Sequence, residues 1–91
     1  MNWHVNWLPD TTQELAAVWL NAPDRNAVTR AAHLIDVQLQ NDPENTGQPY
    51  TNGRRTLLVV PLGVVYRVLR SIRRVEVIHV WWVQPSNGQP P

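Results

Sequence analysis

The chain has 91 residues, of which 43% are hydrophobic, with 8 arginines, 7 acidic residues, no lysine and no cysteine. A chain of this length forms one domain with a single modest core. Without cysteine it has no disulfide scaffold, no thiolate metal site and no Cys nucleophile. No apolar run is long enough to span a bilayer and no secretory leader precedes the domain, so we expect a cytoplasmic protein without a membrane partner.

Charge is divided unevenly along the chain, although the net charge is only +1. Residues 1–53 carry six acidic residues and two arginines, a balance of −4, whereas residues 54–91 carry six arginines and one acidic residue, a balance of +5. Arginine binds phosphates and carboxylates through a planar, bidentate guanidinium. The second half is therefore expected to have an anionic partner. The alternative is an Arg-rich composition without functional meaning.

The first half predicts one strand followed by two helices. Residues 2–8 alternate between apolar and polar side chains, which is typical of a half-buried strand. Thr11 and Glu14 have the spacing of a capping box and predict the start of a helix. Asp24 predicts the N-cap of a second helix that continues to about Asn41. Its apolar stripe consists of Val28, Ala31, Ala32, Ile35 and Leu39. Small alanines within this stripe favour an antiparallel helical hairpin.

The second half predicts a turn-rich loop over residues 45–53 and then three strands, at about 54–60, 64–69 and 74–83. Short connections between these strands predict an antiparallel meander. Residues 84–91 (QPSNGQPP) contain no apolar side chain and are expected to be a disordered tail, so the domain is expected to span residues 1–83. This order predicts an α+β fold, with the helical hairpin on one sheet face and the other face open to a partner.

The register of the last two strands depends on the turn between them. A two-residue turn at Ser71 and Ile72 places Arg67 opposite Glu76, which would neutralise the arginine. A four-residue turn that ends at Ile72 places Arg67 opposite Arg74, a like-charge pair that needs an anion. We favour the second register because it keeps Ile72 out of the ladder.

Six residues of the second half are candidates for contacting a protein or nucleic-acid partner: Arg54, Arg55, Arg67, Arg74, His79 and Trp82. Arginines that project from a sheet can bind RNA phosphates or acidic side chains, or simply keep strand ends soluble. A histidine in an apolar strand can act as an acid or base, or hold a structural hydrogen bond. Adjacent tryptophans must point to opposite faces, so one of Trp81 and Trp82 enters the core and the other is an exposed anchor.

Metal and cofactor chemistry is not indicated. His4, His33 and His79 lie on different predicted elements and lack the spacing of metal ligands, so we expect neither a metal nor a cofactor. The two serines lie outside any nucleophile-elbow motif. Catalytic residues therefore stay unassigned.

The element order and several short motifs resemble the RelE/ParE superfamily of toxins, the toxin halves of bacterial type II toxin–antitoxin modules, which are often labelled plasmid stabilisation proteins. The similarity covers residues 2–83. The motifs that carry it are ELAAVW in the first helix, RRTL and PLGVVYRV in the first two strands of the meander, and VEVIHVW in the last. The resemblance implies a fold of two helices and a four-stranded sheet, and an antitoxin that wraps the toxin and covers its basic face.

The resemblance implies one of two activities. RelE-like members cut mRNA in the ribosomal A site with basic and general acid/base side chains on the open sheet face, whereas ParE-like members poison DNA gyrase. Gly63 stands where RelE-like strands have an arginine, and Trp82 stands where many relatives have a histidine, so the nuclease set is incomplete. We therefore favour a ParE-like toxin that binds a macromolecular target. The alternatives are a ribosome-dependent mRNA endoribonuclease and a non-toxic relative that only binds a partner.

Overall fold

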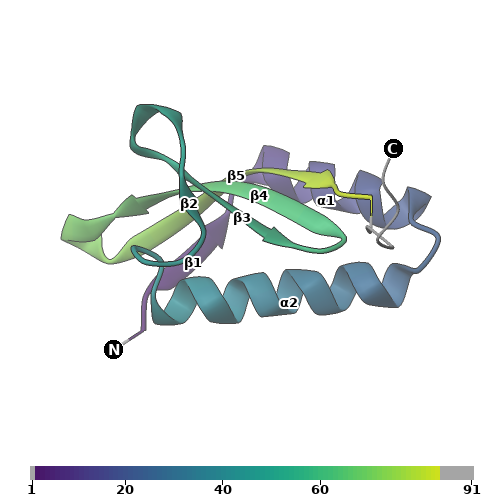
Figure 1. Cartoon of the computed structure of the whole chain (residues 1–91), viewed down its shortest axis with the longest axis horizontal. Coiled ribbons are helices and arrows are strands. Elements are labelled where there is room, and N and C mark those ends of the chain that lie inside the picture. Colours follow the sequence, from purple (N-terminus) through teal and green to yellow (C-terminus); the bar gives the residue numbers. More distant parts are fainter. Residues whose placement is uncertain (1, 85–91) are drawn as a thin grey trace.

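The computed structural model describes residues 2–84 and has a two-layer α+β architecture (Figure 1). The elements are β1 (His4–Trp7), α1 (Pro9–Asn21), α2 (Arg25–Asn41), β2 (Gln48–Pro49), η1 (Thr51–Gly53), β3 (Arg55–Val59), β4 (Leu62–Leu69), η2 (Arg70–Ile72) and β5 (Arg74–Trp82). The predicted first strand, helical hairpin and antiparallel meander are confirmed. Of the tail predicted to be disordered, all but Gln84 lies outside the described residues.

The strands form one sheet in the order β1-β5-β4-β3-β2. The first strand pairs with β5 in parallel, and every other pair is antiparallel. In Figure 1, α2 runs along one side of the sheet and α1 lies behind β5. Neither helix within residues 2–84 is long and apolar enough to cross a membrane.

The core lies between the helices and the strand residues that face them. The predicted apolar stripe of α2 is confirmed, because Val28, Ala31, Ile35 and Leu39 are all buried. They pack against the inward-facing side chains of the sheet, including Leu57, Leu62, Val64, Tyr66, Val75, Val77 and Val80. Each fully buried aliphatic side chain contributes roughly 1.5–3 kcal/mol relative to exposure, so this seam fixes α2 on one face of the sheet.

Thr11 and Glu14 anchor α1 to β5 and do not cap the helix, so the predicted capping box is wrong. The helix begins at Pro9, whose fixed φ and missing N–H suit the first helical position, and its N-cap has no side-chain hydrogen bond. The buried Thr11 hydroxyl lies 2.8 Å from the carbonyl oxygen of Val77 and 2.6 Å from that of Ile78. Both residues therefore bind backbone groups of the strand β5.

The segment predicted as a loop over residues 45–53 contains β2, which pairs with the start of β3 and adds a fifth strand. The Tyr66 hydroxyl lies 2.8 Å from the carbonyl oxygen of Pro43 and 2.6 Å from that of Thr46. The Arg55 guanidinium donates to the carbonyl oxygens of Thr46 and Gly47, at 2.9 and 3.3 Å. Side chains from β3 and β4 therefore hold this segment, which explains why its own sequence shows no strand pattern.

The register that we favoured for β4 and β5 is wrong, because Arg67 pairs with Glu76. The strands are joined by η2 and by Arg73 in the left-handed conformation (φ 49°). This connection already removes Ile72 from the ladder and leaves it exposed, so the reason for favouring the other register falls away. Further along, Tyr66 pairs with Val77 but Val65 pairs with His79, which leaves one extra residue in β5, a β-bulge.

Candidate binding face

The sheet surface that faces away from the helices is the candidate site, and we call it the open face. Paired residues of neighbouring strands point to the same side of a sheet, and side chains alternate along each strand. Starting from the buried core positions, this rule and the register assign the residues of the open face. They are Arg54 directly before β3, Thr56 and Leu58 on β3, Gly63, Val65, Arg67 and Leu69 on β4, and Arg74, Glu76, His79 and Trp81 on β5.

The bulge at Ile78 decides which tryptophan reaches the open face. Strict alternation from Val75 and Val77 would direct Trp82 to the open face. The extra residue shifts the phase, so Val80 is buried and Trp82 packs against the core. Trp81 points the other way and is 39% exposed. The exposed anchor that we expected from this pair is therefore Trp81, and Trp82 belongs to the helix side.

The arginines predicted for the site differ in their surroundings. Arg67 lies on the open face and forms an ion pair with Glu76, with its Nε 2.7 Å from a carboxylate oxygen, so much of its charge is neutralised. Arg74 lies two residues from Glu76 on the same strand face. Within residues 2–84, the side chains of Arg54 and Arg74 take part in no hydrogen bond or ion pair. Arg54 and Arg74 are therefore the arginines of the open face that can bind an anionic group of a partner.

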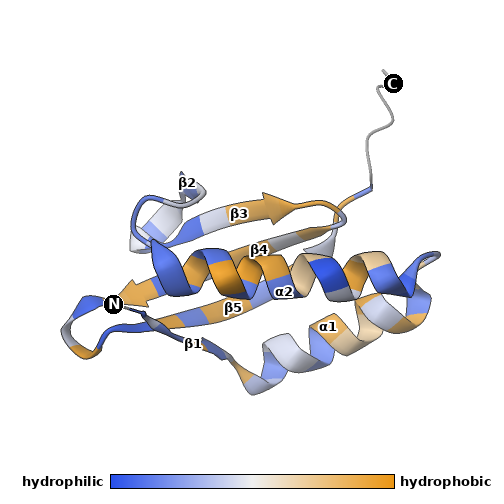
Figure 2. Cartoon of the chain, turned by 90° about the horizontal axis from the view of Figure 1, so that it is seen from below, coloured by the Kyte–Doolittle hydropathy of each residue, from blue (hydrophilic) through white to orange (hydrophobic). Residues whose placement is uncertain are grey.

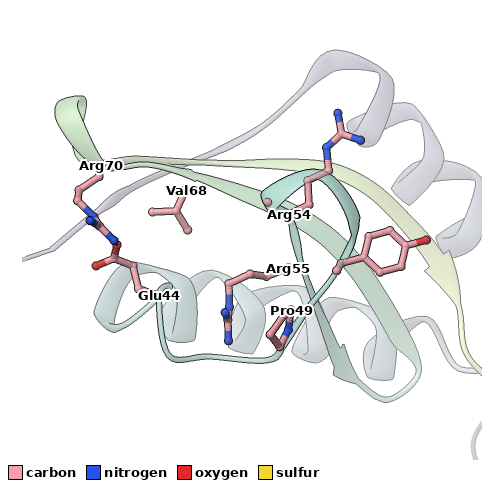
Figure 3. A pocket seen from close by; sticks show the side chains of 8 residues that line it. Glu44, Pro49, Arg54, Arg55, Val68 and Arg70 are labelled. Carbon is pink, nitrogen blue, oxygen red and sulfur yellow. The ribbon is translucent and has the colours of Figure 1, made fainter.

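Three other arginines hold structure away from the open face. Arg55 points to the helix side and binds the backbone of the segment before β2, and Figure 3 shows Arg54 and Arg55 pointing away from each other. The Arg70 side chain is directed at Glu44 and forms an ion pair with it (Figure 3). The Arg73 guanidinium lies 4.4 Å from the centre of the Trp3 ring, a cation–π contact. Of the predicted site residues, Arg55 thus has a structural role in this fold.

His79 lies on the open face beside α1. Its Nδ1 is 3.4 Å from one carboxylate oxygen of Glu14, and the other oxygen accepts the backbone N–H of Val80 at 3.1 Å. The backbone bond fixes the carboxylate, and the carboxylate orients the imidazole. Such a pair can take up or release a proton. The arginine closest to it in the ladder, Arg67, is occupied by Glu76.

The sequence reasoning missed the packing of Trp81 over Gly63 and against Leu58 on the open face, where the three residues lie next to one another on three strands. A signal was present in β5. Its apolar positions keep one phase up to Val77 and the opposite phase from Val80 onward. A phase change of this kind indicates a bulge, which we did not consider.

No protein-family model matches the sequence, and no curated protein matches it. Solved structures match by fold. The toxin–antitoxin complex RelBE2 from Mycobacterium tuberculosis contains a chain with a TM-score of 0.75 and 13% identity, over 90% of this chain and 92% of that one. The chromosomal ParDE system from P. aeruginosa gives a TM-score of 0.64 and 18% identity, over 90% and 97% of the two chains. A mutant of the E. coli toxin RelE in the free state gives 0.66 and 15%, over 92% and 86%.

The chain therefore has the fold of the RelE and ParE toxins, which confirms the resemblance noted in its sequence at the level of the fold. The helical hairpin, the meander and the open face are common to this architecture. Because the identities are between 13% and 18%, the likeness concerns the fold alone. What the open face does has to be argued from its own residues.

Proposed function

We propose that this chain is the toxin component of a type II toxin–antitoxin module. In this proposal it inhibits growth by binding a macromolecular target, as a ParE-like toxin binds gyrase, and a protein antitoxin neutralises it. The observation that carries the proposal is the fold shared with RelE and ParE toxins, together with an open face on which Arg54 and Arg74 form no ion pair within residues 2–84. Gyrase, ribosomes and mRNA are cytoplasmic, so the proposal places the protein there.

Binding is preferred over RNA cleavage because of the chemistry of the open face. Phosphodiester cleavage needs a proton acceptor next to a cation that stabilises the phosphate in the transition state. At the position where RelE-like strands have an arginine, this chain has Gly63, and the Trp81 ring covers it. Arg67 is paired with Glu76. The open face therefore has apolar side chains and charges at its margin that suit binding, but it does not bring a proton acceptor and an unpaired cation together as catalysis would require.

The pair formed by His79 and Glu14 favours the RelE-like endoribonuclease as the second candidate, with mRNA on the ribosome as its substrate. The carboxylate orients a histidine on the open face, as a general base requires. A nuclease of this kind would have to recruit Arg67 away from Glu76, or use Arg74, to hold the scissile phosphate. A non-toxic relative that only binds a partner is the third reading.

Inducible expression in a bacterial host tests the proposal, with growth and the integrity of translated transcripts as readouts. We expect growth arrest with intact transcripts. The double variant Arg54→Gln, Arg74→Gln should relieve the arrest, because it removes both unpaired charges of the open face. The variant Arg30→Gln is the matched control, since it removes an exposed arginine of α2. Arrest with cleaved transcripts would support the nuclease, and normal growth with abundant protein would contradict any toxin role.

A further inference from the structure

An apolar groove runs between α1 and α2, which lie next to each other on the helix side of the molecule (Figure 2). It consists of two cavities of about 380 and 300 Å³. Thr12, Leu15 and Ala32 line both cavities, so the two are continuous. The larger one extends from these shared residues to Trp19, and the smaller one extends to Trp7. We call the whole the helix groove.

Helix α1 keeps most of its apolar surface outside the core of the single chain. Its one fully buried residue is the polar Thr11, whereas α2 buries four residues. Leu15 and Ala16 line the helix groove, and the large side chain of Trp19 is exposed at one end of it. An exposed apolar surface of this kind, lined by both helices, is typical of a contact with another chain.

A cation lies at one end of the helix groove and a carboxylate at the other. The Arg25 guanidinium lies 4.7 Å from the centre of the Trp19 ring and donates to the carbonyl oxygens of Trp19 and Leu20 through Nε and Nη2. One carboxylate oxygen of Asp36 accepts the Nε1–H of Trp7 at 2.9 Å. These bonds fix both side chains. Within residues 2–84, Nη1 of Arg25 and the second oxygen of Asp36 form no hydrogen bond, so each can bind a further group.

The two charges make the helix groove complementary to a second copy of itself. Arg25 and Asp36 are eleven residues apart in the sequence of α2, which is about 16 Å along a helix axis. A rotation by 180° about an axis through the middle of the groove exchanges its two ends. In two copies related by this rotation, Arg25 of each copy faces Asp36 of the other, so the charged contact forms twice. Any other partner would need an anion and a cation at the same spacing and in the reverse order.

The same rotation also brings apolar surface onto apolar surface. The Trp19 end of one copy lies over the smaller cavity of the other, which is lined by Trp7 and His33. The middle of the groove is lined by small side chains, among them Ala16 and Ala32. Because the distance between packed helices depends on the side chains at the contact, small residues there let the helices of two copies approach closely.

We infer that the helix groove is the contact surface between two copies of this chain, related by a two-fold axis that passes near Ala32. In this dimer Arg25 of each copy pairs with Asp36 of the other, and Trp19 covers the cavity beside Trp7. Both open faces stay accessible, because they lie on the other side of the sheet. Dimerisation therefore does not depend on what the open face binds.

Sedimentation equilibrium of the purified full chain tests the dimer. We expect reversible association of two copies at protein concentrations up to about 200 µM, a range that includes micromolar interfaces. A chain that is still monomeric at that concentration would overturn the inference and leave the helix groove to a different protein.

Two neighbouring alanines provide matched variants that locate the contact. Ala16 and Ala17 are both exposed on α1, but of the two only Ala16 lines the helix groove. Ala16→Arg places a bulky charge in the apolar contact and should weaken dimerisation by about tenfold or more, whereas Ala17→Arg should leave it within about twofold. Because both positions are exposed, both variants should fold, which circular dichroism verifies. Equal dimerisation of the two variants would show that the copies meet through another surface.

Charge reversal tests the pairing of Arg25 with Asp36 across the axis. Arg25→Glu and Asp36→Arg each create two like-charge contacts in a dimer of identical copies, so each variant alone should dimerise at least about tenfold more weakly than the wild type. An equimolar mixture of the two variants restores opposite charges at both contacts. It should therefore associate as heterodimers about as tightly as the wild type. A general loss of stability in either variant could not produce this recovery. A mixture that associates no better than its components would overturn the inference.

Discussion

The two edges of the sheet differ in how much of the edge strand is covered by a neighbouring element. On one side β1 pairs with β5 from Arg74 to Val77. Helix α1 continues the cover, because Thr11 contacts the carbonyl oxygens of Val77 and Ile78 and Glu14 accepts the Val80 N–H. On the other side β2 covers only the first two residues of β3 and stops. Figure 2 shows that β3 ends in a hydrophobic, orange segment next to the turn into β4.

The difference indicates where a partner would bind. Exposed strand edges invite pairing with other chains, and proteins usually block them with charges, prolines, short strands or covering elements. The β5 edge is covered by β1 and α1. At the β3 edge, Leu58 and Val60 are 58% and 53% exposed, and no charged residue lies between Arg55 and Arg67 in the sequence. An apolar edge strand without such protection, as at β3, is an expected feature of a binding surface.

Removing the hydroxyl that covers the β5 edge should have the largest effect on folding. Thr11→Val keeps the shape of the side chain but removes the hydroxyl donor at the carbonyl oxygens of Ile78 and of Val77, the second of which still accepts the Leu8 N–H at 3.2 Å. We expect a loss of about 1–3 kcal/mol in the free energy of unfolding, measured by chemical denaturation. Thr12→Val is the control, because Thr12 is exposed on the same helix. Equal losses in the two variants would mean that Thr11 does not anchor the edge.

The covered end of the β3 edge depends on Tyr66, which holds the segment before β2. Burial raises the pKa of the Tyr66 hydroxyl above its usual value, although the Arg55 guanidinium acts in the opposite direction. Since the pKa is higher in the folded than in the unfolded state, its contribution is fully present below about pH 10 and is lost as the pH rises through the folded-state pKa.

Tyr66→Phe should therefore reduce the loss of stability above pH 10. At neutral pH the same variant should cost roughly 1–2 kcal/mol, because the carbonyl oxygens of Pro43 and Thr46 lose the hydroxyl donor, although that of Thr46 keeps the Arg55 guanidinium. The free energy of unfolding as a function of pH measures both effects, with Tyr50→Phe as the control for an exposed tyrosine. An unchanged alkaline slope in the Tyr66 variant would contradict the account.

Two substitutions of Glu14 distinguish the contribution of its hydrogen bond from that of its charge to the stability of the covered β5 edge. Glu14→Gln keeps an acceptor for the Val80 N–H and should change stability little. Glu14→Ala removes the acceptor, and we expect a loss of about 1 kcal/mol and faster hydrogen exchange of the Val80 amide. Nuclear magnetic resonance measures this exchange residue by residue. Slow exchange at Val80 in the Ala variant would show that another group covers the edge.

A charge placed on the open edge should have the smallest effect on folding and a clear effect on binding. Leu58→Lys changes an exposed side chain, so we expect the free energy of unfolding to change by no more than about 0.5 kcal/mol. Growth arrest on inducible expression should still be relieved, because the substitution removes an exposed apolar side chain of the open face. Leu20→Lys is the control, since Leu20 is 60% exposed on α1. Growth arrest by the Leu58 variant as strong as that by the wild type would show that the β3 edge does not contact the target.

The sequence predicted the elements well where local patterns decide them. The helical spacing from Val28 to Leu39 and the turns between strands led to the two-layer fold, its helical hairpin and its meander. It did not predict β2, because that strand is held by Tyr66 and Arg55 from elsewhere in the chain. Contacts between distant segments leave no periodicity in either segment, so local reasoning cannot detect them.

The site was predicted less well than the fold, because it depends on strand phase. One extra residue at Ile78 exchanged the faces of Trp81 and Trp82, and the turn before β5 decided whether Arg67 met Glu76 or Arg74. A shift of one residue moves every side chain to the other face. The excess of positive charge in residues 54–91 could be counted in the sequence. Which of these arginines lie on the open face and which form structural contacts depends on the strand register, which the sequence did not predict.

Growth of bacteria that express the two tryptophan variants tests the central claim most directly. Trp81 lies on the open face and Trp19 on the helices, and both are 39% exposed, so the variants differ in place and not in exposure. At equal protein levels we predict that Trp19→Ala arrests growth like the wild type and that Trp81→Ala does not. Equal arrest by both variants, or relief by Trp19→Ala alone, would contradict the claim that this protein acts through its open face.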